Sequence, residues 1–189
     1  MLARSFLAQH PEAHFVLCLA DEPDPTLTYP DGLDPRIRVV PARALDIAGF
    51  DAMAFQYTVV EFNTAVKPFL LEWLLWREGY TAALYLDPDI LVTAPLSPLY
   101  EALDTRDVVL TPHITTPYED DRHPSVPDLL RAGVYNLGFV GVAARPAVRT
   151  FLRWWQARLE RDCIVAPADG IFVDQRWVDM LPAFHDRVH

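Results

Sequence analysis

The chain contains little cysteine, glycine or lysine for its 189 residues. Cys18 and Cys163 are the only cysteines, Lys67 is the only lysine, and seven residues are glycine. The two cysteines lie far apart and belong to no metal or redox motif, and Cys18 falls in an apolar run typical of a core. Two isolated cysteines fit a reducing compartment such as the cytosol.

Long apolar runs and an excess of basic residues are also absent. No stretch approaches the roughly 20 apolar residues that cross a bilayer, and the N-terminus turns polar too early for a signal peptide. We therefore expect a cytoplasmic protein without a transmembrane segment, or one held peripherally at the inner face of the membrane. The net charge of −10 excludes nucleic acid as an expected partner, because a phosphate backbone requires a basic face.

What the sequence does contain is enough apolar surface for a folded core. Half of the residues are hydrophobic and 12% are aromatic, which argues against disorder. No internal repeat or low-complexity segment divides the chain. The length predicts one domain spanning residues 1–189.

Strand-like apolar runs alternate with helix-like patterns along the chain. Strands are expected at residues 15–19, 37–40, 83–86, 108–110 and 137–143. Helices are expected at residues 2–7, 51–57, 64–78, 99–103 and 171–181, with a further helix beginning at Pro146. Loops are expected at residues 22–35 and 113–127, the second carrying Glu119, Asp120 and Asp121. This alternation predicts an α/β layered fold with a mostly parallel central sheet flanked by helices.

The most informative motif is Asp87-Pro88-Asp89 at the end of an apolar run. Two carboxylates so placed can bind Mg²⁺ or Mn²⁺, which prefer oxygen ligands and leave room for substrate phosphates. Ligands of parallel α/β sheets bind at the carboxyl ends of strands, where Asp21 also falls. The alternative is an ordinary strand followed by an Asp-Pro turn.

Five motifs in one order carry a family resemblance. They are Val66-Lys67-Pro68-Phe69, Tyr85-Leu86-Asp87-Pro88-Asp89, Thr111-Pro112-His113, Asn136-Leu137-Gly138-Phe139 and Val173-Asp174-Gln175. Together they resemble bacterial nucleotide-sugar glycosyltransferases of the GT-A fold, close to glycosyltransferase family eight. The resemblance is strong over residues 61–182 and weak before them. It implies a metal-dependent transferase that uses Mn²⁺ or Mg²⁺ and a UDP-linked sugar donor, with retention at the anomeric carbon and a glycan as a candidate acceptor.

The resemblance also implies a role for each matching residue. Asp87 and Asp89 correspond to the metal-binding Asp-x-Asp, and Asp174 and Gln175 to the catalytic pair beside the anomeric carbon. The implied donor-binding residues are Asp21, Lys67, Asp87, His113, Asn136 and Gly138.

Structural alternatives remain open for several of these residues. Lys67 can be a solvated lysine at a helix start, and Asp174 an exposed acid in the first turn of a helix, where the helix dipole favours it. Asn136 with Gly138 can simply open a strand, Asp21 can be a turn residue, and a lone histidine such as His113 is a weak signal.

Two departures from the family set further expectations. Such enzymes begin with a strand that precedes the first helix, whereas Met1 stands at that helix. They also carry a metal-ligating histidine well after the Asp-Gln pair, and His185 and His189 fall too early for it. We therefore expect a domain that lacks the first strand and the C-terminal metal-ligand segment.

Two other functions compete with sugar transfer. A degenerate domain would bind a nucleotide-sugar without turning it over. A haloacid-dehalogenase-like phosphatase would also place Asp-x-Asp after a strand, with the first Asp as nucleophile. That fold requires a lysine downstream of the motif, whereas Lys67 lies upstream.

Overall fold

The computed structural model describes residues 1–21, 34–117 and 123–189. Residues 22–33 of the first expected loop lie outside this part of the chain. The acids expected in the second loop, Glu119, Asp120 and Asp121, lie outside it too.

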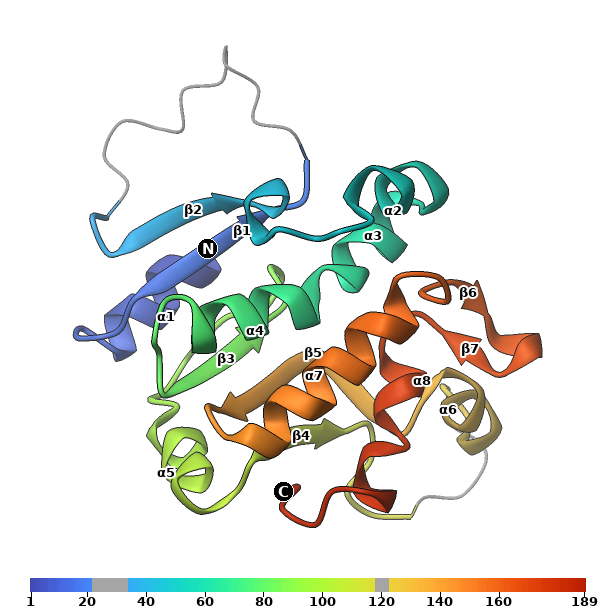
Figure 1. Ribbon diagram of the computed structural model, residues 1–189. Helices are drawn as coiled ribbons and strands as arrows, with labels where there is room; N and C mark the ends of the chain where they lie inside the picture. The colour runs from blue at the N-terminus through green and yellow to red at the C-terminus, as the bar shows by residue number, and fades with distance from the viewer. Residues whose placement is uncertain (22–33, 118–122) are drawn as a thin grey trace.

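The described strands form three small sheets (Figure 1). β1 (Phe15–Leu19) pairs in parallel with β2 (Ile37–Pro41). β3 (Ala82–Leu86), β4 (Val108–Pro112) and β5 (Tyr135–Ala143) form a second sheet in the order β3-β5-β4. β6 (Val165–Ala166) and β7 (Ile171–Phe172) form an antiparallel pair.

The expected mostly parallel central sheet is therefore wrong. β5 runs antiparallel to both of its neighbours, β3 and β4, and the only parallel pair among the named strands is β1 with β2. An apolar run that is buried on both faces has the same composition whichever way its neighbours run. The sequence pattern thus located these strands without giving their directions.

Helices cover both faces of the β3-β5-β4 sheet (Figure 1). The α-helices are α1 (Leu2–Gln9), α2 (Phe50–Gln56), α3 (Val59–Ala65), α4 (Lys67–Trp76), α5 (Ser97–Thr105), α6 (Val126–Ala132), α7 (Pro146–Leu159) and α8 (Gln175–Val178). Short 3₁₀ turns occur at Ala42–Leu45, Pro167–Asp169 and Leu181–Ala183.

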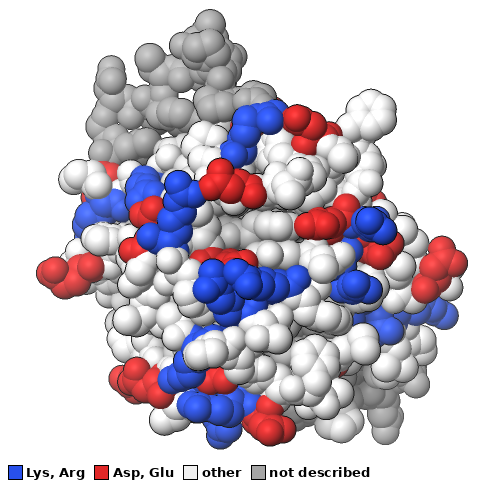
Figure 2. Space-filling model, in the orientation of Figure 1, with Lys and Arg blue, Asp and Glu red and all other residues white. Residues whose placement is uncertain are grey.

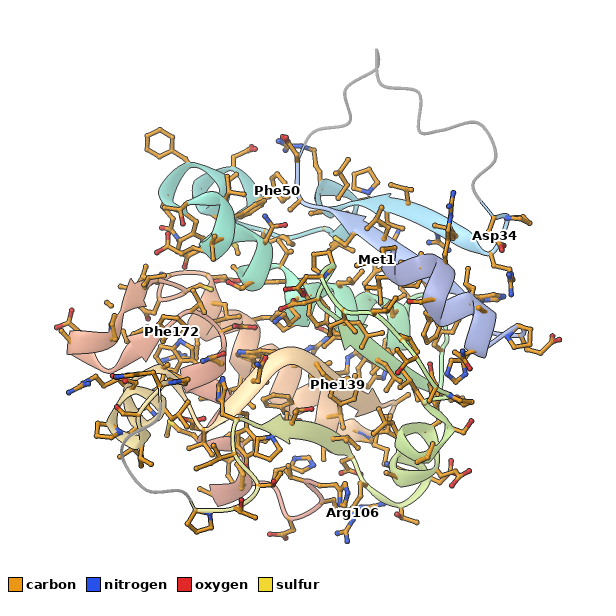
Figure 3. All side chains as sticks on the ribbon, turned by 180° about the vertical axis from the view of Figure 1, so that it is seen from behind. Met1, Asp34, Phe50, Arg106, Phe139 and Phe172 are labelled. Carbon is orange, nitrogen blue, oxygen red and sulfur yellow. The ribbon has the colours of Figure 1, made fainter. Side chains whose placement is uncertain are left out.

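The core divides along the two faces of that sheet. On one face, Val140 and Val142 of β5 pack with residues of α4 and α7, including the fully buried Trp155. On the other face, Leu103 of α5 packs against Val109 and Ala143. Phe139 of β5 lies on this second face, labelled in Figure 3. Acidic and basic side chains are interspersed over the face shown in Figure 2.

The helix expected at 64–78 is α4, which carries Pro68 in its first turn as expected. It begins at Lys67 rather than at Thr64, because a separate helix, α3, precedes it. α3 begins with a capping box, in which Thr58 and Glu61 exchange side-chain and backbone hydrogen bonds, and Pro68 cannot donate to the carbonyl of Thr64, because proline has no N–H. The helix expected at 171–181 is wrong: β7, the four-residue α8 and a 3₁₀ turn occupy that span. Val173, at φ 40°, interrupts it.

None of the helices in the described ranges is both long and apolar enough to span a bilayer.

Candidate metal and nucleotide site

Asp87 stands immediately after β3, at the edge of the three-stranded sheet. Its backbone N–H donates to the carbonyl of Gly138 across the sheet at 2.8 Å. The N–H of Ile90 donates to the Asp87 carbonyl at 3.1 Å, closing the turn that contains Pro88 and Asp89. Asp87 is half-buried and Asp89 is exposed. β3 thus fixes the backbone of Asp87, while Asp89 projects from a turn.

Tyr85 orients the Asp87 carboxylate. The two side chains lie on the same face of the chain because they are two residues apart in extended backbone, and Tyr85 Oη donates to Asp87 Oδ1 at 2.7 Å. Burial, and secondarily the charge of Asp87, raises the pKa of Tyr85 well above its usual range. Tyr85 is therefore protonated at neutral pH and acts as a stable donor. The other carboxylate oxygen, Asp87 Oδ2, lies beside Gly138.

Gly138 provides the space into which that oxygen projects. A Cβ added at residue 138 would lie 2.9 Å from Asn136 Oδ1 and 3.1 Å from Asp87 Oδ2, closer than side chains ordinarily approach. Asn136 Oδ1 also accepts a hydrogen bond from the Gly138 N–H at 2.9 Å. Two oxygens, one from β5 and one from the residue that follows β3, therefore converge over a residue that has no side chain.

This arrangement fits part of a divalent-cation site. Mg²⁺ and Mn²⁺ commonly take one or two protein carboxylates and complete their shells with water and substrate phosphates. Asp87 supplies a fixed carboxylate, Asp89 an exposed one within the same turn, and Asn136 a nearby amide oxygen. Within the described residues, no three acidic, histidine or cysteine side chains gather into a complete ligand set.

Lys67 and Asp174 form a buried ion pair behind this position. Lys67 Nζ lies 2.6 Å from Asp174 Oδ2, and the two side chains are only 1% and 3% exposed. Lys67 Nζ also donates to the carbonyl of Leu137 at 2.8 Å and lies 4.3 Å from the centre of the Tyr85 ring. The solvated-lysine alternative for Lys67 and the exposed helix-start alternative for Asp174 are both wrong.

The pair is electrostatically strained. Burial raises the pKa of Asp174; the charge of Lys67 opposes this rise, and the nearby charge of Asp87 adds to it. Asp174 Oδ2 meets Lys67 at ion-pair distance but has no well-aligned hydrogen-bond partner in the described structure. Asp174 precedes α8 without capping it, and its carbonyl accepts from Trp155 Nε1 at 3.2 Å. Lys67 is thus the counter-charge of its carboxylate, to which the Asp174 backbone N–H also contributes.

The other predicted site residues are more scattered. Gln175 Nε2 donates to the carbonyl of Ala132 at 2.7 Å, which ties α8 to the end of α6. His113 follows β4, and its Nδ1 lies 3.2 Å from the carbonyl of Val134. Asp21 is exposed, two residues beyond the end of β1.

The two C-terminal histidines lie at β4. His185 Nε2 lies 3.0 Å from Asp107 Oδ2, and the His189 carbonyl accepts from the Leu110 N–H at 2.9 Å.

The structure brings together Asp87, Gly138 and Asn136, and connects them through Tyr85 to Lys67 and Asp174. Sequence reasoning missed Tyr85 as a member of this group. Its position two residues before Asp87 is the signal that identifies it, since alternate residues of a strand share a face.

Comparisons with known proteins add one relative. No protein-family model matches the chain. The chain is 30% identical over 124 residues to an uncharacterized protein, YfnF, of Bacillus subtilis (strain 168). The match covers 64% of this chain and 40% of that protein, so this chain corresponds to well under two thirds of its relative.

Proposed function

We propose that this chain binds a nucleoside diphosphate-sugar, most simply a UDP-sugar, together with Mn²⁺ or Mg²⁺, and transfers the sugar to a glycan or other acceptor. The observation that supports this best is the convergence of Asp87 Oδ2 and Asn136 Oδ1 over Gly138, with Tyr85 holding the other Asp87 oxygen. Hard oxygen ligands beside open space suit a cation that must also accept phosphate oxygens.

In this proposal each residue has a separate task. Asp87 and Asp89 hold the metal ion, which when bound offsets the charge of the departing diphosphate. Asn136 offers an amide to sugar hydroxyls or to the metal shell, since an amide both donates and accepts. Lys67 does not reach the donor directly: its ammonium group is buried against Asp174. Its charge instead opposes the rise that burial causes in the pKa of Asp174, beneath the site.

A second candidate is a domain that binds the nucleotide-sugar without turning it over. The position of the two predicted catalytic residues favours it. Asp174 is buried in its ion pair, and the Gln175 amide nitrogen is engaged with the carbonyl of Ala132. In this arrangement neither presents a free polar group to a donor sugar.

A turnover assay distinguishes the two candidate functions, sugar transfer and nucleotide-sugar binding without transfer. The purified chain is incubated with a UDP-sugar and Mn²⁺, and released UDP is measured with and without a panel of glycan acceptors. We expect release that falls at least tenfold in Asp87→Asn and in Asp89→Asn. Asp51→Asn, an exposed acid on α2, is the matched control and should not change release. Metal-dependent UDP binding without any release would establish the binding domain, and neither binding nor release would reject both.

A further inference from the structure

Helix α7 carries no acidic residue, although acidic residues outnumber basic ones in the chain by 26 to 16. Its charged side chains are Arg149, Arg153 and Arg158, and all three are exposed or half-buried. Figure 2 shows basic side chains gathered across the middle of the molecule, where Figure 1 shows α7. A chain with a net charge of −10 therefore has one long helix whose charges are all positive.

Arg149 and Arg153 keep most of their hydrogen-bond donors unpaired. Both donate through Nε to the same oxygen, Glu72 Oε1, at 2.9 and 3.0 Å. The Glu72 side chain is 17% exposed, whereas those of Arg149 and Arg153 are 42% and 60% exposed. In the described part of the chain, no group accepts from the Nη atoms of either arginine, and the Arg158 side chain has no partner. Such unpaired guanidinium groups suit phosphate oxygens, which they can bind through two donors at once.

Three of the five tryptophans accompany these arginines on the surface. Trp154 belongs to α7, and the Arg149 guanidinium lies 5.2 Å from the centre of the Trp76 ring. Trp73 lies one turn before Trp76 on α4. Among the described residues, the indole N–H groups of all three have no acceptor, and none of them is cut off from solvent. The other two tryptophans donate to backbone carbonyls. Tryptophan with an apolar ring and a solvated N–H is typical of membrane–water interfaces.

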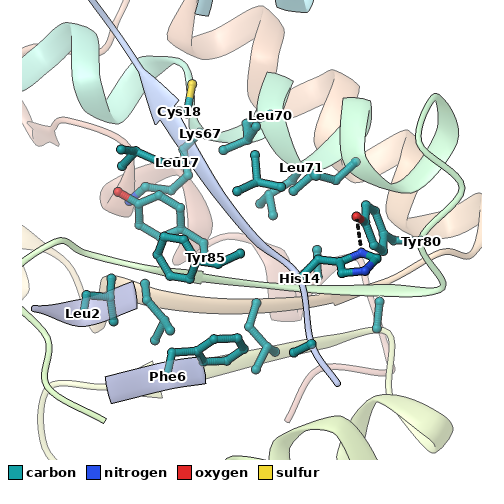
Figure 4. Close-up of a pocket in the computed structure, with 18 of the residues that line it drawn as sticks. Leu2, Phe6, His14, Leu17, Cys18, Lys67, Leu70, Leu71, Tyr80 and Tyr85 are labelled. Carbon is teal, nitrogen blue, oxygen red and sulfur yellow. Dashed lines mark hydrogen bonds between the residues drawn. The ribbon is translucent and has the colours of Figure 1, made fainter. Parts of the chain in front are cut away.

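This face of the molecule is a broad surface rather than a pocket. The cavity of about 480 Å³ is lined by residues of α1, β1, β3 and α4, including Leu70, Leu71 and Tyr85, but by no residue of α7 (Figure 4). Guanidinium groups cover one side of the Trp73 and Trp76 rings, at 4.8 and 5.2 Å from the ring centres. That side is closed to a stacked sugar ring. The surface therefore fits a planar anionic partner better than a small molecule or a sugar.

The net negative charge of the chain does not prevent contact with an anionic membrane. At physiological ionic strength the screening length is about 8 Å, so exposed charges on other faces of the protein are largely screened. Arginines close to the membrane surface are attracted by anionic lipids. The local charge of α7 therefore governs the contact.

We propose that the exposed side of α7, together with Trp73 and Trp76 of α4, docks onto a bilayer surface that contains anionic phospholipids. The three arginines of α7 bind lipid phosphates, and the indole groups lie at the level of the headgroups. The apolar side of α7 stays packed in the core, so docking requires no unfolding. This inference stands apart from the proposed function, because it needs neither a metal ion nor a nucleotide.

Co-sedimentation with vesicles measures this contact. The chain is mixed with vesicles of phosphatidylcholine alone, or of equal amounts of phosphatidylcholine and phosphatidylglycerol, at low and at physiological ionic strength. We expect binding to the anionic vesicles only, and weaker binding as salt is added. Arg153→Gln/Arg158→Gln should bind them at least about fivefold more weakly, since each arginine near the surface contributes to the attraction. This variant retains the ion pair between Arg149 and Glu72, which keeps α4 and α7 together.

The matched control is Arg106→Gln/Arg131→Gln, which removes the same charge from two exposed arginines outside α7. It should bind the anionic vesicles as the parent chain does. Equal weakening in the two double variants would show that net charge alone decides binding, and would overturn the proposal. No binding of the parent chain to anionic vesicles at low salt would overturn it as well. In a parallel titration, binding to soluble polyphosphate without binding to vesicles would assign the surface to another partner.

Tryptophan fluorescence identifies the face in contact with the bilayer. Brominated phosphatidylcholine in the anionic vesicles quenches tryptophans that reach the lipid interface. We expect quenching in the parent chain and less quenching in Trp154→Phe, because Trp154 belongs to the proposed surface. Vesicle-bound protein without any quenching would place the contact on another face and contradict the proposal.

Discussion

Lys67 and Asp174, far apart in sequence, meet in a buried ion pair at 2.6 Å, and the Lys67 ammonium lies 4.3 Å from the centre of the Tyr85 ring. Tyr85 in turn donates to Asp87. The only lysine of the chain is thus connected through one aromatic side chain to the carboxylate most suited to a metal ion. The pair is under the candidate site, and its role in stability can be separated from its role in function.

Breaking the Lys67–Asp174 pair should destabilise the protein strongly. Lys67→Met leaves a buried carboxylate without its counter-charge, which typically costs 3–5 kcal/mol, and Asp174→Leu leaves the ammonium equally isolated. We expect the double variant Lys67→Met/Asp174→Leu to recover most of the loss, because apolar replacement of a buried pair is often neutral. Urea unfolding of the three variants measures this. A double variant as unstable as the sum of the singles would contradict it.

Loss of activity in Asp174 variants alone cannot establish catalysis. The double variant supplies the comparison, because it restores the fold without the carboxylate. If it is stable and still releases UDP from the donor, Asp174 has a purely structural role.

Tyr85→Phe should impair binding more than stability. It removes the hydrogen bond to Asp87 Oδ1 but keeps the ring that faces Lys67 and lines the cavity. The stability loss should be about 1 kcal/mol. Mn²⁺-dependent UDP affinity should fall several-fold, since the Asp87 carboxylate loses its fixed orientation. Calorimetry and urea unfolding on the same sample compare the two effects, with Tyr100→Phe as the control. Unchanged metal dependence would remove Tyr85 from the site.

Gly138→Ala should close the space between Asp87 and Asn136. The added Cβ would stand 2.9 Å from Asn136 Oδ1 and 3.1 Å from Asp87 Oδ2, so both oxygens must move by a few tenths of an ångström. We expect a folded protein with at least tenfold weaker Mn²⁺-dependent UDP binding. Gly49→Ala, where an added Cβ meets nothing within 4 Å, is the control. Equal binding in the two alanine variants would show that the space over Gly138 is not used.

The free energy of unfolding should decrease at acidic pH, partly because Glu72 becomes protonated. Burial raises the pKa of Glu72, but hydrogen bonds from Arg149, Gln156 and Arg153 outweigh this and lower it below its usual value. A carboxyl whose folded pKa is lowered stabilises the protein above its unfolded pKa. That stabilisation is lost as the pH falls through the folded pKa.

Urea unfolding between about pH 6 and pH 3 measures this loss. The parent protein should lose more stability over this range than Glu72→Gln, which cannot titrate there. Identical pH slopes would show that the contact between α4 and α7 does not depend on this charge.

The sequence predicted where the strands lie better than it predicted how they pair. Apolar runs located β1 to β5, since burial on both faces requires uninterrupted apolar residues. Strand direction was not predictable from them, because a buried run has no feature that distinguishes a parallel from an antiparallel neighbour. The helix expected at 171–181 failed because Val173 adopts a positive φ, which its side chain disfavours and only tertiary packing enforces.

The candidate site was predictable in part. Asp87 and Gly138 follow from local motifs, and the backbone hydrogen bond between them confirms that the two motifs are adjacent. The burial of Asp174 against Lys67 was not predictable, because an acid at a helix start is usually exposed. Long-range pairing of charges depends on the assembled fold rather than on spacing.

The coupling between metal and nucleotide tests the central claim most directly. Two carboxylates and a diphosphate repel one another, and a divalent cation in the same site relieves both repulsions, so UDP and Mn²⁺ should bind with positive coupling. UDP affinity is measured by calorimetry with Mn²⁺ and with chelator, in the parent chain, Asp87→Asn, Asp89→Asn and the surface control Asp51→Asn. We predict at least tenfold tighter UDP binding with Mn²⁺ in the parent and in Asp51→Asn, and loss of most of that gain in the other two. Equal UDP affinity with Mn²⁺ and with chelator in the parent chain would contradict the account.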